Sequence, residues 1–498
     1  MPALPRPPSA NTSHHPVVLL LATLGLLAGC ATRPGGESAT LGRWTQLGPD
    51  GSISLRAIVG ATADCPIARV DGSTRPLVPR ARATPAGRPA DPAHDNRAFQ
   101  PGFAVTSCEL GLPASTRQAS IDGQPVPMPG ADPQRIVVVG DTGCRIKVPA
   151  SGPADPIQDC ASPADWPWQR IATAAAHAQP DLVIHLGDYH YREYCDNPAL
   201  CASLNDRKVV IGYGWDGWDA DFFTPAAVLL TAAPWIVVRG NHENCDRGGE
   251  GWMRFLSPLP YQPCPNQTYK SPSQSVLANN LTANAYRIDL GQRLTLVVAD
   301  NAAFPDYLPA SATAGDVAIF ERTLARLHSL PARQPAWLLI HKPLWYDLLP
   351  ASAPPNALQS ALHGRLPAGL QFVFAGHEHA FETINFAPAA DPVNHPAGRP
   401  AQLIVGTGGT QLEAFDPLSP FYEGGAPGSK ESAQPGGRLH EGVAASSGIV
   451  LNRYGFLLLE RHGEAWTGRL MDADGQEISH CRLNGEAREA ACTFPARP

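Results

Sequence analysis

The sequence predicts an α/β fold, on the strength of three observations. The run Ile136–Val139 is continuous and β-branched, as expected for a strand that is buried on both faces. A helical segment, Asp165–Ala178, follows it and precedes a second apolar run that starts at Leu182, so the order is strand, helix, strand. The chain has 498 residues, of which 43% are hydrophobic and 17% charged, enough for a large core.

The region before Ile136 has a different composition. Glycine, proline and arginine separate short apolar runs, and no helical periodicity is present. Residues 44–130 are therefore predicted to form a small β-rich domain, possibly a sandwich; an irregular arm wrapped on the main domain is the alternative. Its expected strands are Ser54–Val59, Phe103–Leu110 and Gln118–Ile121.

The main domain is expected to span residues 134–482, with residues 483–498 as a C-terminal tail. A helix is predicted over Ala314–Leu330, and Asp165 is a possible cap of the earlier helix, with Pro167 in its first turn. Antiparallel strands are expected over Tyr454–Arg482. Further strands are predicted at Trp235–Val238, Leu294–Ala299, Ala336–Ile340, Leu370–Phe374 and Gln402–Val405, and long Pro- and Gly-rich loops at Ala387–Pro400 and Phe415–Ser447.

The amino terminus predicts export. An apolar run, Val17–Leu27, is too short for a comfortable membrane span and ends in Leu27-Ala28-Gly29-Cys30. Residues 1–29 therefore resemble a bacterial lipoprotein signal peptide, with Cys30 as the lipidated first residue and residues 30–43 as a tether. An ordinary secretory signal that is cleaved nearby is the alternative. The expected location is outside the cytoplasm, with a lipid anchor in the membrane.

The cysteine count agrees with export. The chain has 11 cysteines, and setting Cys30 aside leaves ten, an even number that favours disulfides in an oxidising compartment. A zinc cluster is disfavoured because no CxxC pair occurs. Sequence alone leaves the connectivity open, but proximity suggests Cys65–Cys108, Cys144–Cys160, Cys195–Cys201, Cys245–Cys264 and Cys481–Cys492. The net charge of −7 gives no sign of a nucleic-acid surface.

Polar clusters follow several of the predicted strands. In open α/β sheets the ligand site lies beyond the carboxyl ends of the strands, so clusters far apart in sequence can converge there. The glycines before them let the backbone turn sharply. The clusters are Gly140-Asp141-Thr142-Gly143, Gly187-Asp188-Tyr189-His190-Tyr191, Gly240-Asn241-His242-Glu243, His341 and Gly376-His377-Glu378-His379.

These five clusters match GDxG, GDxxY, GNHE, a strand-ending histidine and GHxH. From Arg135 to Leu412 the chain resembles the calcineurin-like metallophosphoesterase superfamily and, within it, the purple acid phosphatases. Many other members of the superfamily carry a histidine where Gly143 stands and lack a tyrosine at the position of Tyr191. The resemblance implies an α+β four-layer sandwich, in which two mixed β-sheets are flanked by helices.

The resemblance also implies a dinuclear metal site. The first ion would be Fe(III), because two carboxylates, a phenolate and an imidazole form a hard, anionic set. The second would be divalent, namely Zn, Fe(II) or Mn, and the shared Asp188 would hold the two about 3.5 Å apart. The implied ligands are Asp141, Asp188, Tyr191 and His379 for the first ion, and Asp188, Asn241, His341 and His377 for the second.

Catalytic roles are implied for Asp188 and His242. His242 would contact the substrate phosphate, orienting an oxygen or protonating the leaving group, although it could instead only orient a ligand. Glu243 and Glu378 are expected to support ligands or face solvent. His190, Arg192 and Lys342 lie near the site in sequence and could contact the phosphate, which the sequence alone does not establish.

The implied activity is hydrolysis of a small phosphate monoester by attack of a metal-bound hydroxide. Two alternatives are a phosphodiesterase acting on nucleotides or lipid head groups, and a metal-stabilised surface binding lipoprotein without catalysis. The sequence leaves the substrate and the oligomeric state open.

Overall fold

The computed structural model describes part of the chain, all of it within the compact unit Ala39–Pro498. The predicted signal segment, Cys30 and residues 31–39 of the tether lie outside it, as does most of the two predicted long loops. Among the described helices, none combines the length and apolar character of a membrane span. The described residues are 40–85, 102–152, 156–264, 285–306, 314–325, 327–329, 335–345, 356–362, 364–367, 369–387, 398–413, 439–440 and 443–493.

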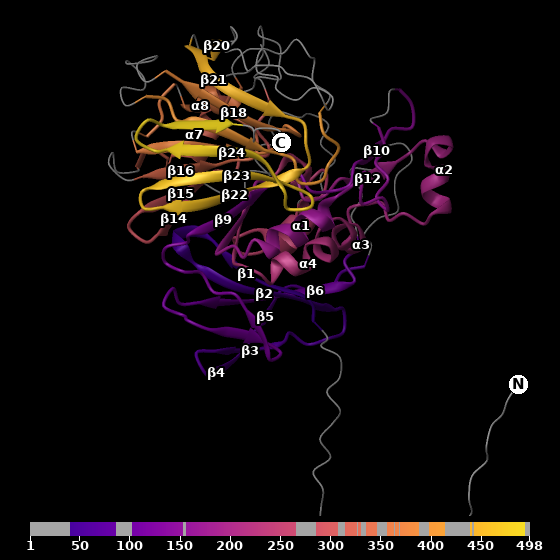
Figure 1. The fold of residues 1–498 in the computed structure, drawn as a ribbon. Coiled ribbons are helices and arrows are strands. Elements are labelled where there is room, and N and C mark those ends of the chain that lie inside the picture. The colour runs from indigo at the N-terminus through magenta and orange to yellow at the C-terminus, as the bar shows by residue number, and fades with distance from the viewer. Residues whose placement is uncertain are drawn as a thin grey trace, which may run out of the picture. The chain divides into compact units, whose positions relative to one another are not determined.

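The first large sheet has 11 strands in the order β25-β24-β23-β22-β9-β11-β13-β1-β2-β6-β5. Figure 1 shows β9 between the C-terminal strands β22, β23 and β24 and the N-terminal strands β1 and β2. Strands β9, β11 and β13 are parallel neighbours, whereas β22 is antiparallel to β9, so the sheet is mixed. The strands are β1 (Thr40–Leu47), β2 (Ile53–Gly60), β5 (Val78–Ala81), β6 (Val105–Leu112), β9 (Arg135–Val139), β11 (Leu182–His185), β13 (Trp235–Val237), β22 (Gly455–His462), β23 (Ala465–Asp472), β24 (Glu477–Asn484) and β25 (Glu489–Thr493).

The second large sheet has 8 strands in the order β14-β15-β16-β17-β19-β18-β21-β20. Strands β15, β16, β17 and β19 are parallel, and β14 and β18 join antiparallel. The end of the predicted loop Phe415–Ser447 belongs to β20 and β21 instead. The strands are β14 (Tyr286–Leu290), β15 (Leu294–Val298), β16 (Ala336–Leu339), β17 (Leu370–Ala375), β18 (Phe381–Phe386), β19 (Ala401–Val405), β20 (Leu439–His440) and β21 (Val443–Leu451).

The two sheets pack face to face and are covered by helices on their outer faces. In β9, Ile136 and Val138 point into the core between the sheets, and Val137 and Val139 point outward to helices, because successive strand side chains alternate. Helices α1 (Trp168–His177) and α4 (Thr224–Leu230) cover the first sheet, and α7 (Ala314–Leu324) and α8 (Ala357–Leu362) cover the second. The predicted four-layer sandwich is confirmed.

Two predicted helix boundaries are wrong. The first helix begins at Trp168 with Pro167 as its N-cap residue and no side-chain cap, because the Asp165 carboxylate accepts the backbone N–H of Asp159 instead. The helix predicted to reach Leu330 ends at Leu324. The other helical segments in the described residues are Pro49–Gly51, α2 (Pro198–Asp206), α3 (Trp215–Trp218), Asp219–Phe223, Asn241–Glu243, α5 (Gly249–Gly251), Trp252–Leu256 and Leu327–Ser329.

The N-terminal region is β-rich, as predicted, but its larger sheet is shared with the rest of the chain. Strand β1 pairs in parallel with β13, and β2, β6 and β5 continue from it, so the expected boundary at residue 130 falls inside one continuous sheet. This corrects the expectation of a self-contained domain. A sheet of four strands packs on β2 and β6: β3 (Ile67–Val70), β4 (Ser73–Pro76), β7 (Ala119–Ile121) and β8 (Gln124–Val126).

The C-terminal strands also exceed their predicted limit. Strand β25 lies within the predicted tail, residues 483–498, and pairs with β24, so the domain boundary at residue 482 is too early. The disulfide that joins these two strands was predicted, and the other four predicted pairs are confirmed as well. The disulfides are Cys65–Cys108, Cys144–Cys160, Cys195–Cys201, Cys245–Cys264 and Cys481–Cys492.

Two features brace the loops that leave the strand ends. A small parallel sheet joins β10 (Ile146–Val148) to β12 (Arg192–Cys195). Arg56 and Arg80, from the N-terminal strands, donate hydrogen bonds to backbone carbonyls between Met253 and Leu259. The N-terminal region thereby supports the segment that follows the GNHE cluster.

Candidate metal centre

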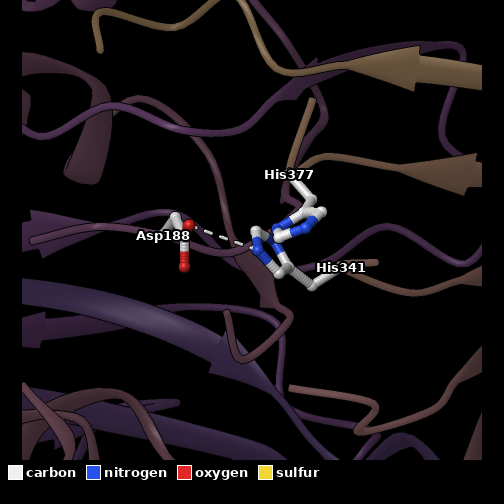
Figure 2. Close-up of side chains that lie close together, drawn as sticks. All are labelled: Asp188, His341 and His377. Carbon is white, nitrogen blue, oxygen red and sulfur yellow. Dashed lines mark ion pairs between the residues drawn. The ribbon is translucent and has the colours of Figure 1, made fainter. Parts of the chain in front are cut away.

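The carboxyl ends of both large sheets meet at one place. Strands β9, β11 and β13 deliver the first three polar clusters from one sheet, and β16 and β17 deliver the last two from the other. Figure 2 shows Asp188 from the first sheet facing His341 and His377 from the second. Ligand atoms of these three residues all lie within 4.8 Å of one another, the arrangement of a metal site.

One group of side chains surrounds the hydroxyl of Tyr191. This oxygen lies 3.2 Å from Oδ1 of Asp141, 2.7 Å from Oδ2 of Asp188 and 2.9 Å from Nε2 of His379. Four oxygen and nitrogen atoms from three segments of the chain thus lie close together. They are the four residues predicted to bind the first ion.

A second group surrounds the side-chain oxygen of Asn241. Oδ1 of Asn241 lies 2.9 Å from Nε2 of His341 and 2.8 Å from Nδ1 of His377. Nε2 of His341 is also 3.2 Å from Oδ2 of Asp188, which therefore belongs to both groups. The structure brings all seven predicted ligands together in two groups that share one carboxylate.

Three of these residues have backbone conformations that residues other than glycine rarely adopt. Asp141, Asp188 and His377 have φ angles of 58°, 58° and 73°, in the left-handed region. Such residues cost of order 1–3 kcal/mol each and cluster at functional sites. Gly240 permits the close approach, because a Cβ there would lie 2.1 Å from Oδ1 of Asp188. The strain is tolerated where it aims polar side chains at a common point.

Gly143 and Tyr191 are linked physically. A Cβ at residue 143 would lie 2.6 Å from the backbone N of Tyr191 and 3.0 Å from Oδ2 of Asp221. A side chain at residue 143 would therefore displace the loop that carries Tyr191. The Asp221 carboxylate accepts the backbone N–H of Tyr191 at 2.7 Å, which keeps that loop in place.

Backbone carbonyls orient two of the histidines. Nδ1 of His341 donates to the carbonyl of Leu186 at 2.8 Å, and Nδ1 of His379 donates to the carbonyl of Gln411 at 2.8 Å. These bonds leave Nε2 of each ring facing the cluster with a free lone pair. His377 is turned the other way: its Nε2 lies 3.2 Å from the Asp306 carboxylate, and its Nδ1 faces Asn241.

Glu243 supports the site without facing it. Its buried carboxylate accepts backbone N–H groups of Asp188, Tyr189 and Gly240 at 2.9–3.0 Å. Burial and the nearby Asp188 raise the pKa of Glu243 to about 8. Its predicted supporting role agrees with these contacts.

The electrostatics of the cluster fit a multiply charged cation. Burial, together with the charge of Asp188, raises the pKa of Asp141 and of Tyr191 well above their usual values. Burial would also raise the pKa of Asp188, but His341 and His242 hold it well below its usual range. A metal ion would stabilise all three as anions, so this donor set suits a hard, highly charged ion.

His242 lies at the edge of the cluster. Its backbone N–H donates to Oδ1 of Asp188 at 2.9 Å, and its ring lies against that of Tyr191, with centroids 3.7 Å apart. Burial, followed by Arg247, lowers its pKa to about 4. Two residues that sequence reasoning missed, Glu193 and Arg247, contact this ring. The sequence offered one signal for each: Glu193 lies two residues after Tyr191, and Arg247 lies five residues after His242.

Of the three residues that could contact phosphate, two are engaged in other contacts. His190 is buried, with Nε2 2.9 Å from the carbonyl of Gly212, and Arg192 is buried in an ion pair with Asp221 at 2.6 Å. Proximity in sequence was misleading because these side chains point away from the cluster into the supporting loops. Lys342 does lie beside the site, 2.9 Å from the carboxylate of Asp306.

Comparison with known proteins decides the family. The family model for calcineurin-like phosphoesterases matches residues 134–381, which contain all seven residues of the two groups. The chain is a calcineurin-like metallophosphoesterase. It is therefore a metal-dependent phosphoric ester hydrolase, and its family implies a dinuclear metal site.

The fold of this metallophosphoesterase resembles solved structures. The purple acid phosphatase PPD1 from seeds of yellow lupin (Lupinus luteus) aligns with a TM-score of 0.50 at 15% sequence identity, covering 88% of this chain and 73% of that chain. A structure of PhoD aligns with a TM-score of 0.46 at 11% identity, covering 94% of each chain. No curated protein sequence matches the chain.

Proposed function

We propose that this metallophosphoesterase hydrolyses phosphate monoesters at a centre that holds Fe(III) and a divalent ion. The observation that carries the proposal is the position of the Tyr191 hydroxyl, within 3.2 Å of Asp141, Asp188 and His379. A phenolate beside two carboxylates favours a trivalent over a divalent ion. The resemblance to purple acid phosphatases supports the same assignment.

The two groups of side chains would hold different ions. The hard set for Fe(III) would consist of Asp141, Asp188, Tyr191 and His379. The remaining ligands would supply an amide oxygen and two imidazoles for Zn, Fe(II) or Mn. When bound, such a pair activates water as a nucleophile and neutralises the charge of the phosphoryl oxygens.

The chain's own residues hold and orient the reactants. The Asp188 carboxylate belongs to both groups of ligands. The His242 ring is only partly buried, and its Nε2 lies 3.8 Å from Oδ2 of Asp188, so it can meet a phosphate that enters the cluster. There it would orient a phosphoryl oxygen or supply the proton that the leaving oxygen takes up.

Parallel assays on two esters test the proposal. Metal-replete protein is expected to hydrolyse p-nitrophenyl phosphate at least about 10-fold faster, in kcat/KM, than bis(p-nitrophenyl) phosphate, a preference of about 1.4 kcal/mol. The reverse preference would assign a phosphodiesterase. Complete inactivity of metal-replete protein on a broad panel of esters would favour a binding protein instead.

We also propose that the enzyme is exported and anchored by lipid on Cys30. The support is the apolar run that ends in Leu27-Ala28-Gly29-Cys30, together with five disulfides, which persist in oxidising compartments. Expressed in a bacterium, the full chain should incorporate labelled palmitate and fractionate with membranes, and Cys30→Ser should do neither. Equal labelling of both proteins would contradict the anchor.

A further inference from the structure

The disulfide between Cys144 and Cys160 lies next to one of the two ligand groups. Cys144 is fully buried and follows the ligand Asp141 by three residues. Cys160 is partly exposed and lines a surface cleft of about 430 Å³ beside α1, so it is the sulfur that an external thiol or disulfide can reach. The nearby group, called the first ligand group below, consists of Asp141, Asp188, Tyr191 and His379.

One pair of contacts links the disulfide to the loop of Tyr191. The backbone N–H of Cys144 donates to Oδ1 of Asp221 at 3.0 Å. Oδ2 of the same carboxylate accepts the backbone N–H of Tyr191 at 2.7 Å. Because Asp221 is fully buried, water does not compete for these bonds. The position of Cys144 therefore helps to set the position of Tyr191.

A second link runs through Gln158, two residues before Cys160. The side chain of Gln158 is buried, and its Oε1 accepts the backbone N–H of Arg145 at 2.8 Å. Its Nε2 donates to the carbonyl of Gly409 at 3.0 Å. Leaving such buried groups without partners is costly, so the amide holds these two segments together. Gln158 thus joins the chain that follows the first polar cluster to the segment that begins at Gly409.

The segment that begins at Gly409 supports two more ligands. Thr410 donates its backbone N–H to the carbonyl of Asp141 at 2.9 Å. The carbonyl of Gln411 accepts a hydrogen bond from Nδ1 of His379 at 2.8 Å. Three of the four residues in the first ligand group are therefore supported by segments that Cys144 or Gln158 contacts.

The second ligand group is supported from other parts of the fold. Nδ1 of His341 donates to the carbonyl of Leu186 at 2.8 Å, and its backbone N–H donates to Oδ1 of Asn301 at 3.0 Å. A different disulfide, Cys245–Cys264, begins four residues after Asn241. Loss of the Cys144–Cys160 disulfide should therefore affect the first ligand group more than the second.

We infer that the Cys144–Cys160 disulfide is a redox switch for the first ligand group, which binds its ion tightly only once the disulfide has formed. With both cysteines reduced, the covalent constraint on Gln158 is lost, and the supports of Tyr191 and His379 loosen. This inference rests on the proposed function, which assigns Fe(III) to this group. The reduced chain would thus acquire this ion only after it reaches an oxidising compartment.

The oxidant of this switch is an external disulfide. The Cys160 thiolate attacks one sulfur of that disulfide and displaces the other as a thiolate, which leaves a mixed disulfide on Cys160. The Cys144 thiolate then attacks Sγ of Cys160 and displaces the second external thiolate. One disulfide bond breaks in the oxidant and one forms in the protein. Two electrons pass to the oxidant, and the two cysteine protons end on its two thiols.

The test is the double variant Cys144→Ala/Cys160→Ala, loaded with Fe(III) and with Zn(II). Competition with a chelator measures the affinity for each ion. The affinity for Fe(III) is expected to fall about 10- to 100-fold, the range for residues that hold a metal ligand in place. The affinity for Zn(II) should change by less than about threefold, because the second group has separate supports.

Cys481→Ala/Cys492→Ala is the matched control. This disulfide closes a loop with a sequence separation of 11, against 16 for Cys144–Cys160, so its removal should cost a similar amount of stability. The melting temperature of the control should fall, while its affinity for both ions stays as in the wild type. Equal loss of iron affinity in the two double variants would overturn the inference, because general loss of stability would then be the cause.

The wild-type chain provides a second measurement if Cys144→Ala/Cys160→Ala does not fold. Metal-free protein is equilibrated in glutathione buffers of graded oxidation, and peptide mapping of alkylated cysteines reports which pairs are oxidised. The colour that appears on addition of limiting Fe(III) should follow the oxidised fraction of Cys144–Cys160. Full colour in protein whose Cys144–Cys160 pair is reduced would overturn the switch.

Iron binding separates this inference from the proposed function. A wild type that binds Fe(III) with colour but hydrolyses neither ester overturns the proposed activity alone. An active wild type whose Cys144→Ala/Cys160→Ala variant holds iron just as tightly overturns the redox switch alone.

Discussion

Asp188→Ala is expected to lose both metal ions and to lower kcat/KM by about 10³-fold or more, because bound metals supply several kcal/mol of transition-state stabilisation. One carboxylate oxygen, Oδ2, lies 2.7 Å from the Tyr191 hydroxyl and 3.2 Å from Nε2 of His341, so its removal breaks both ligand groups. Elemental analysis and kinetics on p-nitrophenyl phosphate measure the two effects in the same sample.

Asp206→Ala is the matched control for this variant. Asp206 is exposed at the end of α2, so its removal should leave metal content and activity as in the wild type. An Asp188→Ala protein that still held two ions per chain would show that this carboxylate does not bridge them.

Tyr191→Phe is expected to abolish the visible absorption of the iron-loaded protein, which arises from charge transfer between tyrosinate and Fe(III). The wild type should be coloured. Iron affinity should fall by about 100-fold or more, beyond the 10- to 100-fold typical of residues that only support a ligand. An active, iron-containing wild type without colour would remove Tyr191 from the ligand set.

Proton release provides a second measurement of the same residue. Because the pKa of Tyr191 is raised well above its usual value, the phenol holds its proton in the metal-free protein at every pH below that value. Ligation must release this proton, so iron affinity falls as the pH falls. Calorimetry in buffers of different ionisation enthalpy should find about one proton fewer released by Tyr191→Phe.

Tyr189→Phe is the matched control, since Tyr189 lies in the same loop. Its hydroxyl donates to the carbonyl of Val238 at 3.0 Å, and its ring stacks on His185. This variant should lose some stability but keep the colour and the proton release of the wild type.

Local patterns in the sequence were sufficient for many of the strands, and they selected seven candidate ligands that the fold brings together. A buried strand such as Ile136–Val139 is recognised in the sequence as a continuous apolar run. A glycine followed by a carboxylate or an imidazole residue indicates where such a strand ends. All seven predicted ligands converge because the parallel strands of each large sheet end at one edge, and these two edges meet. The disulfide pairs were also predictable, since most of them close short loops.

Contacts between distant segments were not predictable in the same way. The pairing of β1 with β13 merges the N-terminal strands into the main sheet, and no local pattern encodes which edge strand accepts a new partner. Likewise, Arg192 follows a ligand in sequence but turns into an ion pair with Asp221, which is 29 residues away.

The sequence by itself predicted the chemistry of this protein: which atoms are candidates to bind metal, and that Gly143 and Tyr191 occur together. The tertiary structure decided why they do, because only the folded loop shows that a side chain at residue 143 would collide with the backbone of Tyr191. It also decided the surroundings of His242. Glu193 and Arg247 belong to no motif, and their contacts with the His242 ring depend on distances between loops that only packing sets.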